Sequence, residues 1–275
     1  MRTDSTRANS ATFAANRAQG AVRFGVHLQD GVTRRGILHE SGSLRVRFPS
    51  PEQEGLSGVF VNTAGGIAGG DRFDIDITAG EGARLTLTTA AAEKVYRAPG
   101  PTAQLDIALK AAAGAHLAWL PQETILFDRA RLKRRIEVEL AAGVSLVMAE
   151  AVVFGRSAMG EAVEEGAFTD NWRVRHNGRL MFAETLRLDG AIATKLKEPA
   201  VTRGGVAIAT VLAVPGDQAM AERVRAQTFC GEVGVSAWNG LAVARLCAKD
   251  GASLRRDLAA VIVALGGALP RLWLN

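Results

Sequence analysis

The chain has 275 residues, of which 48% are hydrophobic and 22% charged, and its formal net charge is +5. This composition is that of a globular protein with enough apolar residues for a sizeable core. The positive charge raises the question of nucleic acid, but the chain has one tyrosine and no basic stretch interleaved with the aromatic rings on which bases stack. We therefore expect no nucleic-acid binding.

Residues 1–20 are polar and lack the apolar core of a secretory signal, so we expect a flexible segment there. Nothing afterwards marks a linker, which predicts one domain over residues 21–275. The longest apolar run, 258–269, is about half the roughly 20 residues that a membrane span needs. Cys230 and Cys247 lack metal-ligand spacing and are expected to be free, buried thiols in a reducing cytoplasm.

From about residue 21 to 190 the sequence has the period of two that is typical of half-buried strands, as in FDIDIT (73–78) and RIEVEL (135–140). Four units place a glycine between two such strands, at Gly82, Gly114, Gly143 and Gly178, with separations of 32, 29 and 35 residues. A period near 30 residues built of strands and turns indicates stacked β-strand layers of the β-helix or solenoid kind. A meander of hairpins is the alternative.

Two α-helices are expected near the C-terminus. Asp217 is a predicted N-cap for a helix in DQAMAERVRAQ (217–227), and a second helix is expected from Ser253 to about Leu269. Residues 233–248 between them alternate as strands do. The predicted fold class is therefore mainly β, closed by two α-helices.

The segment NTAGGIAGGD (62–71) has four glycines in ten residues. Gly65 and Gly70 have the spacing of a phosphate-binding loop, but Asp71 and Arg72 stand where that loop needs Lys and Ser or Thr. A strand pattern follows instead of the helix whose N-terminus would bind the anion. We expect a glycine turn that lets backbone pack closely and places Asp71 at the head of a strand.

Several carboxylates are predicted to fall at strand ends in the repeat region, and we take six as candidate site residues: Asp71, Glu93, Glu123, Asp128, Glu150 and Glu184. Three of them, Glu123, Glu150 and Glu184, follow their glycines by nine, seven and six residues, so stacked layers would hold them in a row. Such a row suits a divalent cation in transit. It also suits the acid and base of a glycosidase, or surface carboxylates paired with arginines.

A dense basic run covers residues 129–135. Charge runs of this kind are usually a solvated strand edge. The functional alternative is a docking patch for an acidic protein partner, with Arg131 and Arg134 among its residues.

Six segments in order resemble the urease accessory proteins of the UreD family, called UreH in some organisms. They are NTAGGIAGGD (62–71), TTAAAEKVYRAPG (88–100), WLPQETILFDRARL (119–132), EAVVFGRSAMGE (150–161), WRVRHNGRLMFAETLRLDG (172–190) and PRLW (270–273). The resemblance runs from about residue 20 to the end. It departs at Ala64, where many members have proline, and at Glu93, where others have an uncharged residue.

This resemblance implies a mostly β stack of strands with a pair of helices and no enzymatic activity. It implies a maturation factor that binds UreF, through UreF the GTPase UreG, and apo-urease, and it allows a homodimer within the accessory complex. No cofactor is expected to be held tightly, because nickel passes in transit along a tunnel to the urease active site.

The family has carboxylates associated with this tunnel at the positions of Asp71, Glu150 and Glu184. Glu93, Glu123 and Asp128 are added from the repeat argument. The residues expected to bind a partner are Tyr96, Arg97 and Arg156 in the matching motifs, with Arg131 and Arg134 of the basic run.

Two alternatives stay open. A β-solenoid polysaccharide hydrolase would use a carboxylate pair, but it needs aromatic sugar platforms, and the chain has four tryptophans and one tyrosine. An interaction scaffold without a metal route would share every feature except the tunnel.

Overall fold

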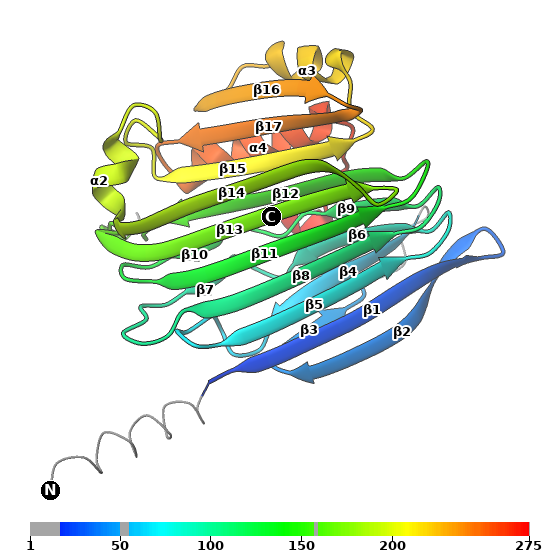
Figure 1. Cartoon of the computed structure of the whole chain (residues 1–275), viewed down its shortest axis with the longest axis horizontal. Coiled ribbons are helices and arrows are strands. Elements are labelled where there is room, and N and C mark those ends of the chain that lie inside the picture. The colour runs from blue at the N-terminus through cyan, green and yellow to red at the C-terminus, as the bar shows by residue number, and fades with distance from the viewer. Residues whose placement is uncertain (1–16, 50–54, 157–158, 275) are drawn as a thin grey trace, which may run out of the picture.

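Two β-sheets packed face to face form the body of the protein (Figure 1). The computed structural model describes residues 17–49, 55–156 and 159–274. The first sheet has seven strands in the spatial order β14 (Arg179–Ala191), β13 (Glu165–His176), β11 (Arg131–Leu140), β8 (Ala103–Ala111), β5 (Arg72–Ala79), β1 (Gln19–Gln29) and β2 (Val32–Gly42).

The second sheet has ten strands. Eight follow the order β16 (Glu232–Trp238), β17 (Leu241–Ala248), β15 (Ala207–Val214), β12 (Ser145–Phe154), β9 (His116–Trp119), β6 (Arg84–Thr89), β4 (Leu56–Asn62) and β3 (Leu44–Arg47). The short strands β7 (Glu93–Val95) and β10 (Thr124–Leu126) continue it, with β10 between β7 and β12.

Successive layers stack in parallel register, which confirms the solenoid-like prediction. The chain passes from a strand of the first sheet to one of the second through a turn at Gly82, Gly114 and Gly143, whose φ values are 63°, 65° and 70°. This left-handed conformation favours glycine. The turns also bond to one another, since the amides of Gly82 and Gly114 donate to the carbonyls of Ala113 and Ala142, both at 3.0 Å.

The fourth unit differs from the predicted repeat. Asn177 and Gly178 both have positive φ, at 50° and 75°, and they join β13 to β14 as an antiparallel hairpin within the first sheet. An Asn-Gly pair favours the tight hairpin turn whose twist matches the strands it joins. The chain therefore turns back at Gly178 instead of crossing to the second sheet.

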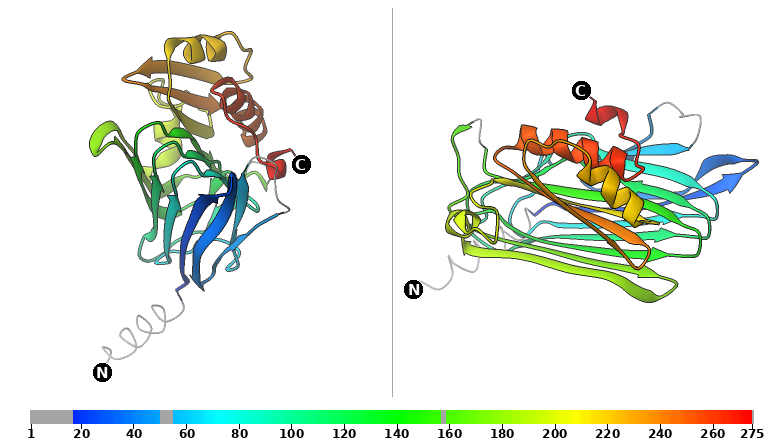
Figure 2. Two further views of the ribbon diagram at one scale, coloured as in Figure 1. Left: turned by 90° about the vertical axis from the view of Figure 1, so that its right-hand side faces the viewer. Right: turned by 90° about the horizontal axis from the view of Figure 1, so that it is seen from above.

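Apolar side chains from both sheets fill the space between them, and a second apolar cluster lies on the outer face of the second sheet. The helix α4 (Gly251–Ala264) covers that outer face over β15 and β17, as Figure 2 shows. Because β12 is buried on both faces, its sequence SLVMAEAVVF is almost continuously apolar, as expected for such a strand. Its single charged residue is Glu150.

Both predicted C-terminal helices are present. Asp217 caps α3 (Gln218–Arg225) by accepting from the Met220 amide at 2.8 Å, and Asp250 caps α4 in the same way from Ser253 at 2.7 Å. The helix α4 ends at Ala264, earlier than expected, because Gly266 (φ 85°) turns the chain out of the helix. The short helix α2 (Ile192–Lys197) was not predicted, since six residues are too few to show helical periodicity.

Residues 17–20, at the end of the expected flexible segment, make defined contacts. The Arg17 guanidinium donates to the carbonyl of Gly69 at 2.7 Å, and β1 begins at Gln19. Residues 1–16 of the expected flexible segment lie outside the described residues. The cysteine prediction is wrong for Cys230, which is exposed, while Cys247 is half-buried. Of the helices in the described ranges, none has the length and apolar character to cross a membrane.

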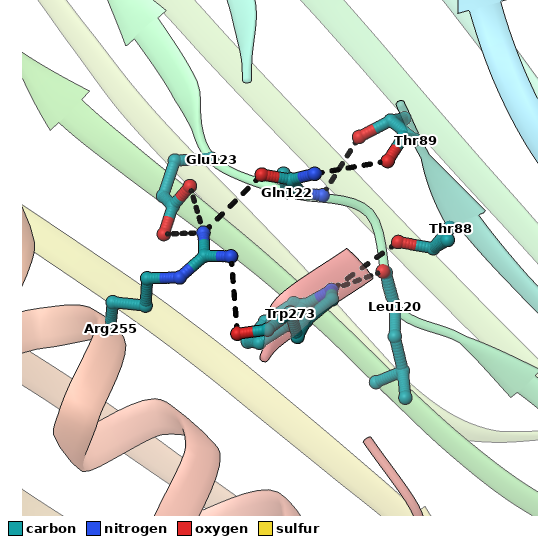
Figure 3. A network of polar contacts seen from close by, with 7 residues as sticks. All are labelled: Thr88, Thr89, Leu120, Gln122, Glu123, Arg255 and Trp273. Carbon is teal, nitrogen blue, oxygen red and sulfur yellow. Dashed lines mark hydrogen bonds and ion pairs between the residues drawn. The ribbon is translucent and has the colours of Figure 1, made fainter. Parts of the chain in front are cut away.

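The end of the chain is fixed to the outer face of the second sheet through Trp273, in the short 3₁₀ turn η2 (Arg271–Trp273) (Figure 3). Its indole N–H donates to the carbonyl of Leu120 at 3.1 Å and to the hydroxyl of Thr88 at 3.3 Å. Arg255 of α4 lies 5.2 Å from the Trp273 ring and donates to both carboxylate oxygens of Glu123 at 3.0 Å. The terminal turn and α4 thus hold the loop before β10.

We expect Trp273→Ala to lower the free energy of unfolding by about 3–5 kcal/mol, because it removes a buried aromatic side chain and leaves two acceptors unpaired. The measurement is urea denaturation. The matched control is Leu274→Ala, since Leu274 is 71% exposed and its removal should change stability by no more than about 0.5 kcal/mol. Equal unfolding midpoints for the two variants would contradict the role given to Trp273.

Candidate functional site

Two cavities lie next to one another between the sheets. The first, of about 310 Å³, is bounded by residues of β5, β8 and β11 on one side and of β4, β6 and β9 on the other. The second, of about 300 Å³, lies between β13 and β14 on one side and β12, β15 and β17 on the other. Arg134 and Glu150 line both cavities. These two side chains therefore stand at the boundary between them.

Arg134 points into the protein because of its position in β11. Inward positions of this strand carry Leu132, Ile136 and Val138, and Arg134 occupies the same phase of the alternation. Only 1% of its surface is exposed. The expectation that Arg134 belongs to a surface docking patch is therefore wrong, whereas Arg131 is exposed as expected.

Three polar side chains bind the Arg134 guanidinium. Its Nε donates to Oδ1 of Asp170 at 3.0 Å, and a terminal N–H donates to Oδ2 of the same carboxylate at 2.5 Å. The other terminal nitrogen donates to Oε2 of Glu150 and to the Thr124 hydroxyl at 3.3 Å. The remaining Glu150 oxygen accepts from the Trp119 indole at 2.8 Å. We call Glu150, Arg134 and Asp170 the buried triad.

Two carboxylates share one guanidinium in this triad, away from water. Burial raises the pKa of Glu150 to about 7, the positive charge of Arg134 opposes this rise, and the negative charge of Asp170 adds to it. Burial alone would lower the pKa of Arg134, but the charges of Asp170 and Glu150 outweigh it and raise the pKa. Arg134 is thus a permanent positive charge, and Glu150 is harder to ionise than an ordinary glutamate.

Glu93 lines the first cavity from β7. Burial raises the pKa of its carboxyl to about 7, against a weak opposing contact with the Asn62 amide, whose nitrogen lies 3.4 Å from each carboxyl oxygen. The Asn62 amide also donates to the carbonyl of Gly66 at 3.0 Å. A second titrating carboxyl is therefore present on the wall of the first cavity.

Glu184 lines the second cavity from β14. It pairs with Arg245 of β17 at 2.5 Å, so this ion pair joins the two sheets. The half-buried Cys247 lines the same cavity, and burial raises the pKa of its thiol.

The three remaining candidates line neither cavity between the sheets. Asp71 is buried at the head of β5 and accepts from the amides of Ala18 at 2.9 Å and Ala68 at 2.7 Å. Asp128 accepts from the amides of Glu164 and Glu165 at 2.9 and 3.1 Å. Both carboxylates hold backbone in place.

Glu123 faces the other side of the second sheet. It pairs with Arg255 of α4, and both line a depression of about 760 Å³ on the outer face. The predicted row of Glu123, Glu150 and Glu184 is therefore wrong, because Glu123 lies in a loop that does not follow the alternation of β12. Three residues line both this depression and the first cavity: Ala90, Ala91 and Gln122. The outer depression and the two cavities thus adjoin in series.

The glycine segment packs closely, as the sequence predicted. A side chain at Gly66 would overlap the Tyr96 ring, whose hydroxyl donates to the carbonyl of Gly65 at 2.8 Å. Tyr96 also packs edge-on against Phe127, with ring centroids 5.2 Å apart. Tyr96 therefore fixes the glycine turn to the strand region beside it.

Of the other expected partner-binding residues, Arg97 is exposed and Arg156 is bound within the chain. The Arg156 guanidinium donates to Glu161 at 2.7 Å and lies 4.3 Å from the centroid of the Phe127 ring. Within residues 17–49, 55–156 and 159–274, no three His, Cys, Asp or Glu side chains gather closely enough to hold a metal ion.

Sequence reasoning missed Asp170, Thr124 and Trp119 as members of the site. Asp170 had a visible signal, since Phe168, Asp170 and Trp172 share the inward phase of β13. A charged residue in that phase indicates an interior partner, and in the β11–β13 ladder Arg134 lies directly opposite it.

The sequence model of the UreD urease accessory protein family matches residues 18–274. The chain belongs to the UreD family. It is 68% identical over 268 residues, 97% of each chain, to the urease accessory protein UreD of Bradyrhizobium diazoefficiens. It is 66% identical over 278 residues, covering all of both chains, to that of Rhodopseudomonas palustris strain HaA2. The two cavities and the buried triad thus belong to a UreD-family protein.

The pKa of Glu93 predicts a pH dependence of stability. The folded pKa of about 7 lies above the ordinary value of 4.5, so this carboxyl contributes stability below about pH 4.5 that is lost as the pH rises toward 7. In Glu93→Gln the fall in unfolding free energy between about pH 5 and pH 8 should be smaller than in the unaltered protein. Glu150 contributes to the fall that remains.

Urea titrations at a series of pH values measure this change. The control is Glu81→Gln, which alters an exposed carboxyl and should leave the pH profile unchanged. A Glu93→Gln profile identical to that of the unaltered protein would show that this carboxyl ionises alike in both states.

Proposed function

We propose that this protein is a non-enzymatic factor of urease maturation that binds UreF, through UreF the GTPase UreG, and apo-urease, and that conducts Ni²⁺ toward the urease active site. Membership of the UreD family supports the role in urease maturation. In this proposal the protein works in the cytoplasm and holds no cofactor tightly. A homodimer within the accessory complex stays a prediction.

The proposed route is supported by one observation: the outer depression and the two cavities between the sheets form a series. The outer depression adjoins the first cavity, and the first cavity adjoins the second. Each part has carboxylates on its wall or at its boundary, among them Glu123, Glu93, Glu150 and Glu184 in that order. A cation could pass these oxygens one after another.

The ligand chemistry supports transit over storage. Nickel is retained best by imidazole and thiolate ligands, and carboxylates bind it more weakly. The one thiol on the route, Cys247, has a raised pKa because it is buried, so it is a neutral and weaker ligand near pH 7. Weak binding at several points lets an ion move on.

The exposed arginines remain candidates for partner contacts. Arg97 pairs with Ala130 in an isolated bridge, which places it beside Arg131 at the end of the basic run. Exposed cations at one end of the sandwich suit an acidic partner surface.

The hydrolase alternative is less well supported. Glu150 and Asp170 are the carboxyl pair at the boundary of the cavities, and both are hydrogen-bonded to one guanidinium. A glycosidase needs one carboxyl free to give a proton and another to act as base or nucleophile on a sugar between them. An interaction scaffold without a metal route differs from our proposal only in the nickel step.

A variant that fills the second cavity tests this step. Thr210 lines that cavity and lies directly opposite Glu150 in the β12–β15 ladder. We expect Thr210→Phe to lower the nickel content of urease several-fold at limiting nickel, because the ring obstructs the route. Its overpacking should cost about 1–3 kcal/mol of stability. The measurement is the metal content of urease purified from cells in which the variant replaces the natural protein.

The matched control is Thr169→Phe, which adds the same ring on the outer face of the first sheet, opposite Lys133. Capture of UreF by both variants establishes that the complex still forms. Full nickel loading with Thr210→Phe would reject the route and favour the scaffold. Full loading in cells that lack the protein altogether would reject the maturation role itself.

A further inference from the structure

Arg134 occupies the only boundary shared by the two cavities in the described part of the chain. Its backbone belongs to the first sheet, and its guanidinium reaches Thr124 and Glu150 of the second. Asp170, beside it in the first sheet, holds the same guanidinium by two hydrogen bonds. The side chain therefore crosses the gap between the sheets and separates the first cavity from the second.

A permanent positive charge in this place opposes the passage of a cation. The guanidinium lies away from water, where like charges repel one another far more strongly than they do in bulk solvent. A route for Ni²⁺ through the two cavities must therefore move Arg134 aside. Space for that movement exists, because a cavity of about 300 Å³ lies on either side of the triad.

We propose that Arg134 is an exchange gate: its guanidinium closes the passage while it bridges Glu150 and Asp170, and a divalent cation opens the passage by replacing it on these two carboxylates. This inference rests on the proposed nickel route and names the residue that regulates it.

The contacts of the triad explain why the gate stays closed without a cation. If Arg134 moved away alone, two buried carboxylates would lose the positive charge that they share, which is strongly unfavourable. A divalent cation supplies the missing charge, and the Thr124 hydroxyl adds a further oxygen ligand. The Trp119 indole holds one Glu150 oxygen in either state, so the exchange takes place at the other.

The first test measures binding of Ni²⁺ alone to the full chain by equilibrium dialysis. In Arg134→Gln the carboxylates have lost their competitor, so we expect one nickel site at least about tenfold tighter than any in the unaltered protein. Adding Asp170→Asn should abolish that site. The matched control is Arg135→Gln, in the next position of β11, whose guanidinium pairs with Asp106 on the outer face at 2.9 Å. It should bind nickel as the unaltered protein does.

A second measurement does not depend on the folding of a charge variant. Ni²⁺ that replaces the guanidinium lies close to Trp119 and, being paramagnetic, should quench its fluorescence in the unaltered protein. This part of the quenching should be absent in Trp119→Phe. A folded Arg134→Gln with unaltered nickel affinity would overturn the gate. Should Arg134→Gln fail to fold, the absence of Trp119-dependent quenching would overturn it instead.

The gate and the route can fail separately. Suppose that Thr210→Phe abolishes nickel loading of urease while folded Arg134→Gln binds nickel as the unaltered protein does. These two results together would reject the gate and leave the route. If urease is fully loaded with nickel in the presence of Thr210→Phe, the route is rejected. The gate then has no part in nickel transfer, whatever the nickel affinity of Arg134→Gln.

Discussion

Parallel, in-register pairing between successive layers is the constraint on which the other features depend. Each layer aligns its inward residues with those of its neighbours, so a polar residue in one layer meets a defined position in the next. Arg134 lies opposite Asp170 in the first sheet, and Thr124 lies opposite Val152 in the second. The left-handed glycine turns at Gly82, Gly114 and Gly143 maintain this register by repeating one crossing geometry.

The buried triad is a costly arrangement in such a core. Well-packed apolar residues of similar volume often stabilise a protein as much as a buried ion pair does, whereas loss of one charged partner costs about 3–5 kcal/mol. The triad is therefore poorly explained by stability. Its position at the boundary of two cavities, with hydrogen bonds to both sheets, is better explained by control of what passes between them.

The sequence predicted the layers well and the site less well. Period-two strands, the glycine spacing and the Asp217 cap are local signals, and the structure confirms them. Gly178 departs from the predicted repeat because its neighbour Asn177 makes a hairpin turn, which the spacing of glycines alone does not distinguish. Arg134 lies in the interior and not on the charged surface that the density of basic residues predicts, because the alternation of β11 decides which face a side chain takes.

Contacts between distant segments had no local signal. Glu123 pairs with Arg255, which lies 132 residues further along the chain in α4. The spacing of Glu123 from its glycine does not predict that this helix packs beside it. Trp273 likewise bonds to Thr88 across 185 residues, two positions from the end of the chain. The outer depression is therefore a late product of folding: its walls come both from the layered core and from Arg255 and Leu272, so it is complete only when these distant segments have docked.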